Sequence, residues 1–429
     1  MSSFSLIQFG TAIICLFFSY VGRKNNKNRH NPLYLFNLEW ALILGLGILN
    51  LLGYYVISEY TAFIILIGVV SFNLGVLSSS KMIGEHYERT RIQLFGYRNC
   101  SYNKLLVEII FFFPPLYLTT KMLKVLPMLQ AGLSYGYIRI QYWTTKSIIT
   151  GGFDYFLNNT VCKAFELIIV PYVLLEIFQK RLKIHHLLLC ILSIGLEVFI
   201  AGGRMILLET IFVILLMLSI SGISFSLPEK FRKKIKKRLY IGIGLAIVGI
   251  AFITGDRQSE MSFFSAITSN FTLCLPLMDY LVNLAHKTGD MMYGLVFFRG
   301  FLEIICTFTG PIGFSFPKPL VELDKYTNPF YPISDFQVAN AYTSMFLDFY
   351  LDGRIIGVIL GCLIFGFIVQ RIYLRMRSNP NDELVIIYII FCKAILYSFF
   401  QWKFMMGAYV LAVIITRIIY LNTKSEVQG

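Results

Sequence analysis

Charged residues are scarce in this chain: Asp, Glu, Lys and Arg together make up 14% of its 429 residues. A soluble domain carries about 25%, so most of the sequence cannot face water. Hydrophobic residues make up 56%, and many fall in runs that can cross a bilayer, which takes about 20 apolar residues for about 30 Å of hydrocarbon. The sequence therefore predicts an all-α, polytopic integral membrane protein.

Motifs for metal binding and disulfide formation are also missing. The eight cysteines are scattered and include no C-x-x-C pair, which argues against a disulfide framework or a cysteine metal site. The segments expected outside the membrane contain no D-x-D element, although Asp348 and Asp352 are four residues apart. We therefore expect no metal and no cofactor. The net charge of +14 comes without a soluble recognition module, so nucleic acid is not an expected partner.

We expect about eleven transmembrane helices in a single membrane domain, residues 1–429. Their approximate limits are 4–22, 33–56, 60–79, 105–125, 160–178, 187–202, 205–226, 239–255, 354–371, 384–400 and 403–420.

Lysine and arginine divide unevenly between the connecting loops. With the N-terminus outside, the basic clusters face the cytoplasm, and the largest is EKFRKKIKKRL at residues 229–239. This is the pattern of the positive-inside rule; it accounts for the net charge and places the C-terminus in the cytoplasm. The first span has its positive cluster after it, so we expect an anchor that starts outside and not a cleaved signal peptide.

Two longer outward loops are expected, at residues 126–159 and 256–353. The second lies near the C-terminal third of the chain, and its length predicts that it folds onto the membrane face as helices. Within it, 262–284 and 292–312 are nearly apolar enough to be spans, but their polar residues fall mid-segment. Amphipathic or re-entrant helices are therefore favoured over two further spans.

A minority of the arginines lies in outward positions, and the positive-inside rule does not account for these. Arg204 follows Gly202 and Gly203 at the outward end of the sixth span, and Arg257 lies just after the eighth. A guanidinium grips phosphate oxygens with two parallel hydrogen bonds, so a lipid-linked diphosphate at headgroup depth is the expected ligand. The alternative for Arg204 is a side chain that only snorkels to the interface. The expected diphosphate-binding residues are Arg204, Arg257, Arg139 and Arg299.

Acids, amides, hydroxyls and aromatics typical of sugar binding gather before the ninth span. They are Asp335, Asn340, Tyr342, Thr343, Asp348 and Asp352. Each acid also has a structural interpretation, as a helix cap, a solvated face or a turn residue. Arg354 follows the Asp352 turn and can pair with either acid nearby, which favours a structural or sugar-binding role for Asp352. His286 is the one histidine expected outside, where it can serve as a general base or lie on the surface.

The chain resembles the Wzy-type oligosaccharide repeat-unit polymerases of O-antigen and capsule assembly in three features. Glycines precede an arginine between two spans, a second arginine opens a large outward loop, and a polar segment leads into a glycine-rich span. The motifs are short and degenerate, and they run from about Leu187 to Tyr373; the topology extends the resemblance to the whole chain. The residues that carry it are Gly202, Gly203, Arg204, Arg257, Asn340, Tyr342, Thr343, Asp352, Gly353, Gly357, Gly361 and Gly366.

The resemblance implies a GT-C-like glycosyltransferase in a bacterial cytoplasmic membrane, and the lack of a D-x-D element in the outward loops favours a metal-independent mechanism. Its substrates would be polyprenyl-diphosphate-linked oligosaccharides, joined on the outer face, and its partners a chain-length regulator and a flippase. Arg204 and Arg257, supported by Arg139 and Arg299, would stabilise the departing diphosphate. The expected catalytic bases are, in falling order, Asp335, Asp348 and His286. The expected sugar-binding residues are Asn340, Tyr342, Thr343 and Asp352.

Three other functions stay open. An O-antigen ligase shares the large outward loop, but a clear outward histidine motif is expected of it, and His286 in LAHKTGD is a weak match. A flippase or transporter of lipid-linked sugars is expected to carry charges in mid-membrane, and Lys163 and Lys393 do lie within spans. A scaffold of a polysaccharide export complex would tolerate substitution of the outward arginines.

Overall fold

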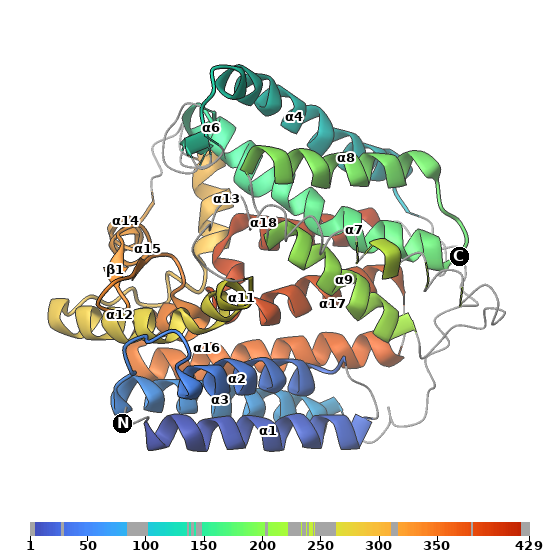
Figure 1. Ribbon diagram of the computed structural model, residues 1–429. Coiled ribbons are helices and arrows are strands. Elements are labelled where there is room, and N and C mark those ends of the chain that lie inside the picture. Colours follow the sequence, from blue (N-terminus) through green and yellow to red (C-terminus); the bar gives the residue numbers. More distant parts are fainter. Residues whose placement is uncertain are drawn as a thin grey trace. The chain divides into compact units, whose positions relative to one another are not determined.

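The computed structural model is almost entirely α-helical over the residues that it describes (Figure 1). Those residues are 5–26, 30–83, 102–134, 137–138, 141–142, 148–201, 205–221, 233, 237, 240–242, 244, 263–309, 316–378 and 381–421.

Within that part of the chain, helices occupy ten of the eleven expected spans, and the eighth, 239–255, lies mostly outside it. Six helices are both long and apolar enough to cross a membrane. The chain thus has the character of a multi-pass membrane protein, and the count of eleven spans stays a prediction. The six stretches are Leu6–Lys24, Pro32–Leu49, Glu59–Lys81, Lys104–Gln130, Ile184–Ala201 and Ser344–Ser378.

The chain divides into two compact units. Unit 1 comprises Met1–Thr90, Phe264–Ser378 and Phe391–Met406, and unit 2 comprises Arg91–Phe263, Asn379–Ile390 and Gly407–Gly429. Helix α17 (Asp382–Leu396) contributes residues to both.

Unit 1 is built on four helices that run side by side, with the segments of the second expected outward loop added to them (Figure 1). The four are α1 (Leu6–Asn26), α2 (Pro32–Leu49), α3 (Glu59–Ile83) and α16 (Ser344–Ser378). The other elements are α11 (Phe263–Thr272), α12 (Cys274–Thr288), α13 (Arg299–Thr309), α14 (Lys318–Glu322), α15 (Asp324–Thr327), the short strands β1 (Tyr331–Pro332) and β2 (Val338–Ala339), and the 3₁₀ turn η4 (Lys403–Met405).

Helices α3 and α16 form the closest helix pair of unit 1, because glycines face backbone on both sides. A Cβ at Gly75 would lie 2.2 Å from the carbonyl oxygen of Leu363, and one at Gly366 would lie 2.3 Å from that of Phe72. Small residues of this kind allow helix backbones to approach in membranes. The glycine-rich character of the ninth span therefore has a packing explanation.

Helix α16 is interrupted at Gly353 and Arg354, just where the sequence places the start of the ninth span. Arg354 has φ 55°, in the left-handed region that disfavours side chains. The first part of α16 folds back on the second, since a Cβ at Gly357 would lie 2.2 Å from the carbonyl oxygen of Phe349. The residues just before the break thus lie against the span that follows it.

The second expected outward loop folds as helices, as predicted. Apart from α16, which begins at Ser344 and continues into the ninth span, the longer helices among its described residues are shorter than a span: α11, α12 and α13 have 10, 15 and 11 residues. Helix α13 is strongly amphipathic and half-exposed, as interfacial helices are.

Unit 2 is a second group of helices. They are α4 (Lys104–Gln130), α6 (Gly151–Phe156), the π-helix η2 (Leu157–Cys162), α7 (Lys163–Phe178), α8 (Ile184–Ala201), α9 (Met205–Ser221) and α18 (Gly407–Ile419). Helix α4 packs on α8, and α18 packs on α7. Most side chains of α7 are apolar and buried.

Candidate functional site

Three of the four expected diphosphate-binding arginines, Arg204, Arg257 and Arg139, lie outside the described residues. Arg299 and all the expected catalytic and sugar-binding residues are described, and all belong to unit 1. The site can therefore be built from the acids of α16 and the polar segments around them.

Asp352 anchors the turn that precedes α13. Its two carboxylate oxygens accept the backbone N–H groups of Val296 and Phe297, at 2.8 and 2.7 Å. The side chain is 7% exposed. Because both oxygens already bind backbone, the geometry favours the structural interpretation of Asp352 over sugar binding.

Arg354 binds neither acid through a hydrogen bond in the described structure. It donates to the carbonyl oxygen of Ala285 over 2.9 Å, and its guanidinium lies 5.0 Å from the centre of the Tyr350 ring. In place of the ion pair with a nearby acid that the sequence suggested, Arg354 forms a hydrogen bond to the C-terminal part of α12.

Asp348, one turn before Asp352, anchors a different loop. Its carboxylate accepts the N–H of Trp402 over 2.6 Å and the hydroxyl of Thr343 over 3.4 Å, and it is 1% exposed. Arg299 is near enough for its charge to act on this carboxylate. A general base must reach the proton that it removes, and burial makes Asp348 less suited to that task than an exposed acid.

Asp335 lies at the exposed tip of the hairpin formed by β1 and β2, which pair antiparallel. The hydroxyl of Tyr55 donates to its carboxylate over 2.9 Å, and the N–H of Tyr55 donates to the carbonyl of Ile333. The hydrogen bond to Asp335 raises the pKa of Tyr55. Beside the acid, Phe336 is 96% exposed. The tip therefore offers an accessible carboxylate next to an aromatic ring.

The segment from Asn340 to Thr343 runs from this hairpin into α16. Asn340 donates to the carbonyl of Asn328 over 3.0 Å, and the hydroxyl of Tyr342 donates to Asn270 over 3.4 Å. Both side chains are half-buried, whereas Thr343 is buried. Of the four expected sugar-binding residues, Asn340 and Tyr342 thus have surface for a ligand, whereas Thr343 and Asp352 act inside the fold.

His286 lies in the last turn of α12 and is exposed. Lys287 follows it in the same turn, and Gly289 ends the helix in the left-handed conformation. This exposed position suits a surface role and does not by itself provide a base.

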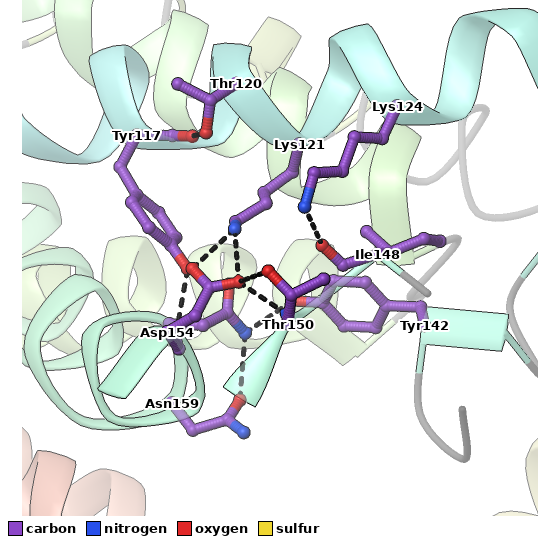
Figure 2. A network of polar contacts seen from close by, with 10 residues as sticks. Tyr117, Thr120, Lys121, Lys124, Tyr142, Ile148, Thr150, Asp154 and Asn159 are labelled. Atoms are coloured by element: carbon purple, nitrogen blue, oxygen red, sulfur yellow. Dashed lines mark hydrogen bonds and ion pairs between the residues drawn. The ribbon is translucent and has the colours of Figure 1, made fainter. Parts of the chain in front are cut away.

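In unit 2, the end of the first expected outward loop is tied to α4 by a network around Asp154 (Figure 2). Lys121 and Tyr117 of α4 both reach this carboxylate, at 2.6 and 2.7 Å, and the N–H of Thr150 donates to it over 2.7 Å. Burial would raise the pKa of Asp154, but these partners lower it below its usual value. The carboxylate is therefore charged and fixes the loop on the helix.

A second polar group of unit 2 lies inside the helices, where Lys163 begins α7 directly after the π-helix η2. Lys163 forms ion pairs with Glu166, at 3.3 Å, and with Glu197 of α8. Glu197 is 3% exposed. The sequence pointed to Lys163 within a span; it did not reveal the two acids that accompany it, because one of them comes from another helix. Ionisable groups inside membrane helices commonly mark a functional path.

Comparison of the chain with protein families, with curated proteins and with solved structures finds no match.

Proposed function

We propose that this protein is a membrane glycosyltransferase that polymerises polyprenyl-diphosphate-linked oligosaccharide repeat units on the outer face of a bacterial cytoplasmic membrane. The observation that carries the proposal is the exposed carboxylate of Asp335, held by Tyr55 beside the exposed ring of Phe336. Aromatic faces pack on the apolar faces of sugar rings, and a carboxylate at that edge can bind or deprotonate a hydroxyl.

In the proposed reaction, Asp335 removes the proton from the acceptor hydroxyl of one lipid-linked repeat unit. The hydroxyl oxygen forms a bond to the anomeric carbon of the donor glycan, and the bond from that carbon to the donor's diphosphate oxygen breaks. The electron pair leaves with the polyprenyl diphosphate, and the proton on Asp335 passes to water. General base catalysis of this kind contributes about 100- to 10,000-fold to a rate.

Positive charge is needed where the diphosphate leaves. We assign this task to Arg204 and Arg257 from their sequence positions, with Arg139 and Arg299 in support. Arg299 begins α13, and the anchored turn at Asp352 fixes where that helix starts. Asp352 is thus a positioning residue in this proposal, and Asp348 is another.

The test is the surface glycan ladder of a host that carries the matching repeat-unit genes. Wild type, Asp335→Asn, Arg204→Ala and Arg257→Ala are compared at equal membrane abundance. Asp324→Asn is the matched control, because Asp324 is another exposed acid of the same loop. We expect the first three variants to display single repeat units without the long ladder, and the control to keep the ladder.

An unchanged ladder in Asp335→Asn would remove Asp335 from the reaction, and unchanged ladders in both arginine variants would leave the diphosphate site without support. If the variants still make the long repeat polymer but no longer attach it to the lipid core, the ligase function is favoured instead.

A second function, transport of the lipid-linked oligosaccharide, is favoured by one observation. Lys163, Glu166 and Glu197 form a buried charged group among helices. Charged mid-membrane groups are typical of transporters. If Glu197→Gln keeps single repeat units from reaching the outer face while Asp335→Asn does not, transport is the function of this chain.

A further inference from the structure

A group of metal-type ligands lies in unit 2, where the first turns of α4 and α8 meet. Glu108 of α4 and His185 and His186 of α8 each offer one ligand atom, and the three atoms lie within 4.8 Å of one another. Residues 104 and 183 belong to loops that the sequence places on the cytoplasmic side, opposite to the proposed glycan chemistry. The group is therefore independent of the proposed polymerase site.

His186 is held in one orientation. Its Nδ1 lies 2.9 Å from the carboxylate of Glu176, both side chains are buried, and its ring stacks on Phe111 with 4.0 Å between centres. A carboxylate accepts this hydrogen bond, so Nδ1 is the donor and Nε2, on the opposite side of the ring, is left for another partner. Carboxylates hold metal-binding histidines in this way.

The Nε2 atom of His186 has no hydrogen-bond partner in the described structure, although the residue is 0% exposed. It lies 3.4 Å from a carboxylate oxygen of Glu108. Two acceptor atoms repel each other, so either a proton on Nε2 or a bound cation must lie between this nitrogen and the carboxylate oxygen. The unpartnered nitrogen therefore points to a ligand.

The spacing of the atoms fits a tetrahedral metal. Bonds of about 2.0–2.1 Å at the tetrahedral angle place neighbouring ligand atoms about 3.3 Å apart. His186 Nε2 lies 3.4 Å from one oxygen of Glu108, and His185 Nε2 lies 3.2 Å from the other, so both nitrogens face the same carboxylate at distances close to this value. His185 is half-exposed, so the group opens toward solvent.

We propose that Glu108, His185 and His186 bind a divalent transition metal of the Zn²⁺ class, with water as a fourth ligand. Glu176 fixes the ring of His186 from behind. Lys183 lies 2.8 Å from Glu108 and competes with the metal for its carboxylate. Because Lys183 is more than one third exposed, its ammonium can move to solvent when the metal binds.

The test is titration of the untagged, chelator-treated full chain in detergent with Co²⁺, followed by the visible absorption of tetrahedral Co²⁺ and by competition with Zn²⁺. We expect one ion per chain in the wild type. His185→Ala and Glu108→Gln lose the signal, and Glu176→Gln weakens binding about 10- to 100-fold. Lys183→Ala binds more tightly than wild type, because it removes the competing charge. His286→Ala, which alters an exposed histidine of unit 1, is the control.

His185 is half-exposed, so its loss leaves the fold intact and the test does not depend on the buried His186. An absent Co²⁺ signal in the wild type overturns the proposal, as does binding that survives both His185→Ala and Glu108→Gln. Weaker Co²⁺ binding by Lys183→Ala would also contradict the proposal, because Lys183 is expected to compete with the metal for the carboxylate of Glu108. None of these results depends on whether the chain polymerises glycans.

Discussion

The hydroxyl of Tyr55 donates a hydrogen bond to the carboxylate of Asp335 over 2.9 Å, across 280 positions of the chain. The loop that follows α2 thus holds the tip of a hairpin from the large outward loop. A preorganised carboxylate keeps its place while a substrate binds. This contact turns an exposed acid on a loop into a positioned one.

Loss of the Tyr55 hydroxyl should reduce polymerisation without unfolding the protein. Tyr55→Phe removes a hydrogen bond that positions the exposed carboxylate of Asp335, so we expect a ladder shifted to shorter chains at normal abundance. Tyr293→Phe, at a site that is 75% exposed, should leave the ladder unchanged. Equal ladders in wild type and Tyr55→Phe would mean that Asp335 needs no support from Tyr55.

Asp352→Asn should destabilise the protein more than Asp335→Asn does. The buried carboxylate of Asp352 accepts two backbone N–H groups, and an amide can accept with only one of its two positions. We expect Asp352→Asn to lower the Tm in detergent by several degrees and Asp335→Asn to leave it close to wild type. The reverse order would show that Asp352 is not the anchor of α13.

Helix packing in unit 1 is tested at two glycines. Gly75→Ala places a Cβ 2.2 Å from a backbone oxygen of α16, which cannot move as a side chain can. We expect a large fall in folded protein in the membrane. Gly45→Ala is the matched control, because nothing lies within 4 Å of its Cβ position; helix propensity predicts that it is neutral or stabilising. Equal yields of the two variants would argue against the close contact of α3 with α16.

Acid should weaken the segment that follows α12. Burial would raise the pKa of Asp290, but hydrogen bonds from Lys325, Thr288 and Tyr326 lower it to about 2. A lowered pKa stabilises the folded state above the unfolded value of 3.8, and that stability disappears as the pH falls through about 2. The Tm advantage of wild type over Asp290→Asn should be full at pH 6 and reduced at pH 3. A constant difference would contradict the assignment.

The sequence predicted most of the helices, because long apolar runs bounded by charge leave few alternatives. It also placed the start of the ninth span at the break in α16, where Gly353 and Arg354 interrupt the helix. It left the roles of Asp348 and Asp352 open, since an acid four residues from another looks the same whether it binds a sugar or a distant backbone. Their partners, such as Trp402, come from segments that no local pattern connects to them.

The proposed metal ligands Glu108 and His186 could not be predicted from the sequence for the same reason. No local motif connects the two residues, because they are separated by 78 positions and meet only when α4 packs on α8. The expectation of no metal rested on the cysteines and on the outward loops, and neither includes these residues.

The central claim is tested most directly with purified protein in vesicles and a synthetic polyprenyl-diphosphate repeat unit. Release of polyprenyl diphosphate and formation of glycans of two or more units are measured together. The account predicts one diphosphate released for each new linkage by the wild type, and a rate about 100- to 10,000-fold lower for Asp335→Asn. No linkage formed by the wild type, or equal rates for the two proteins, would contradict it.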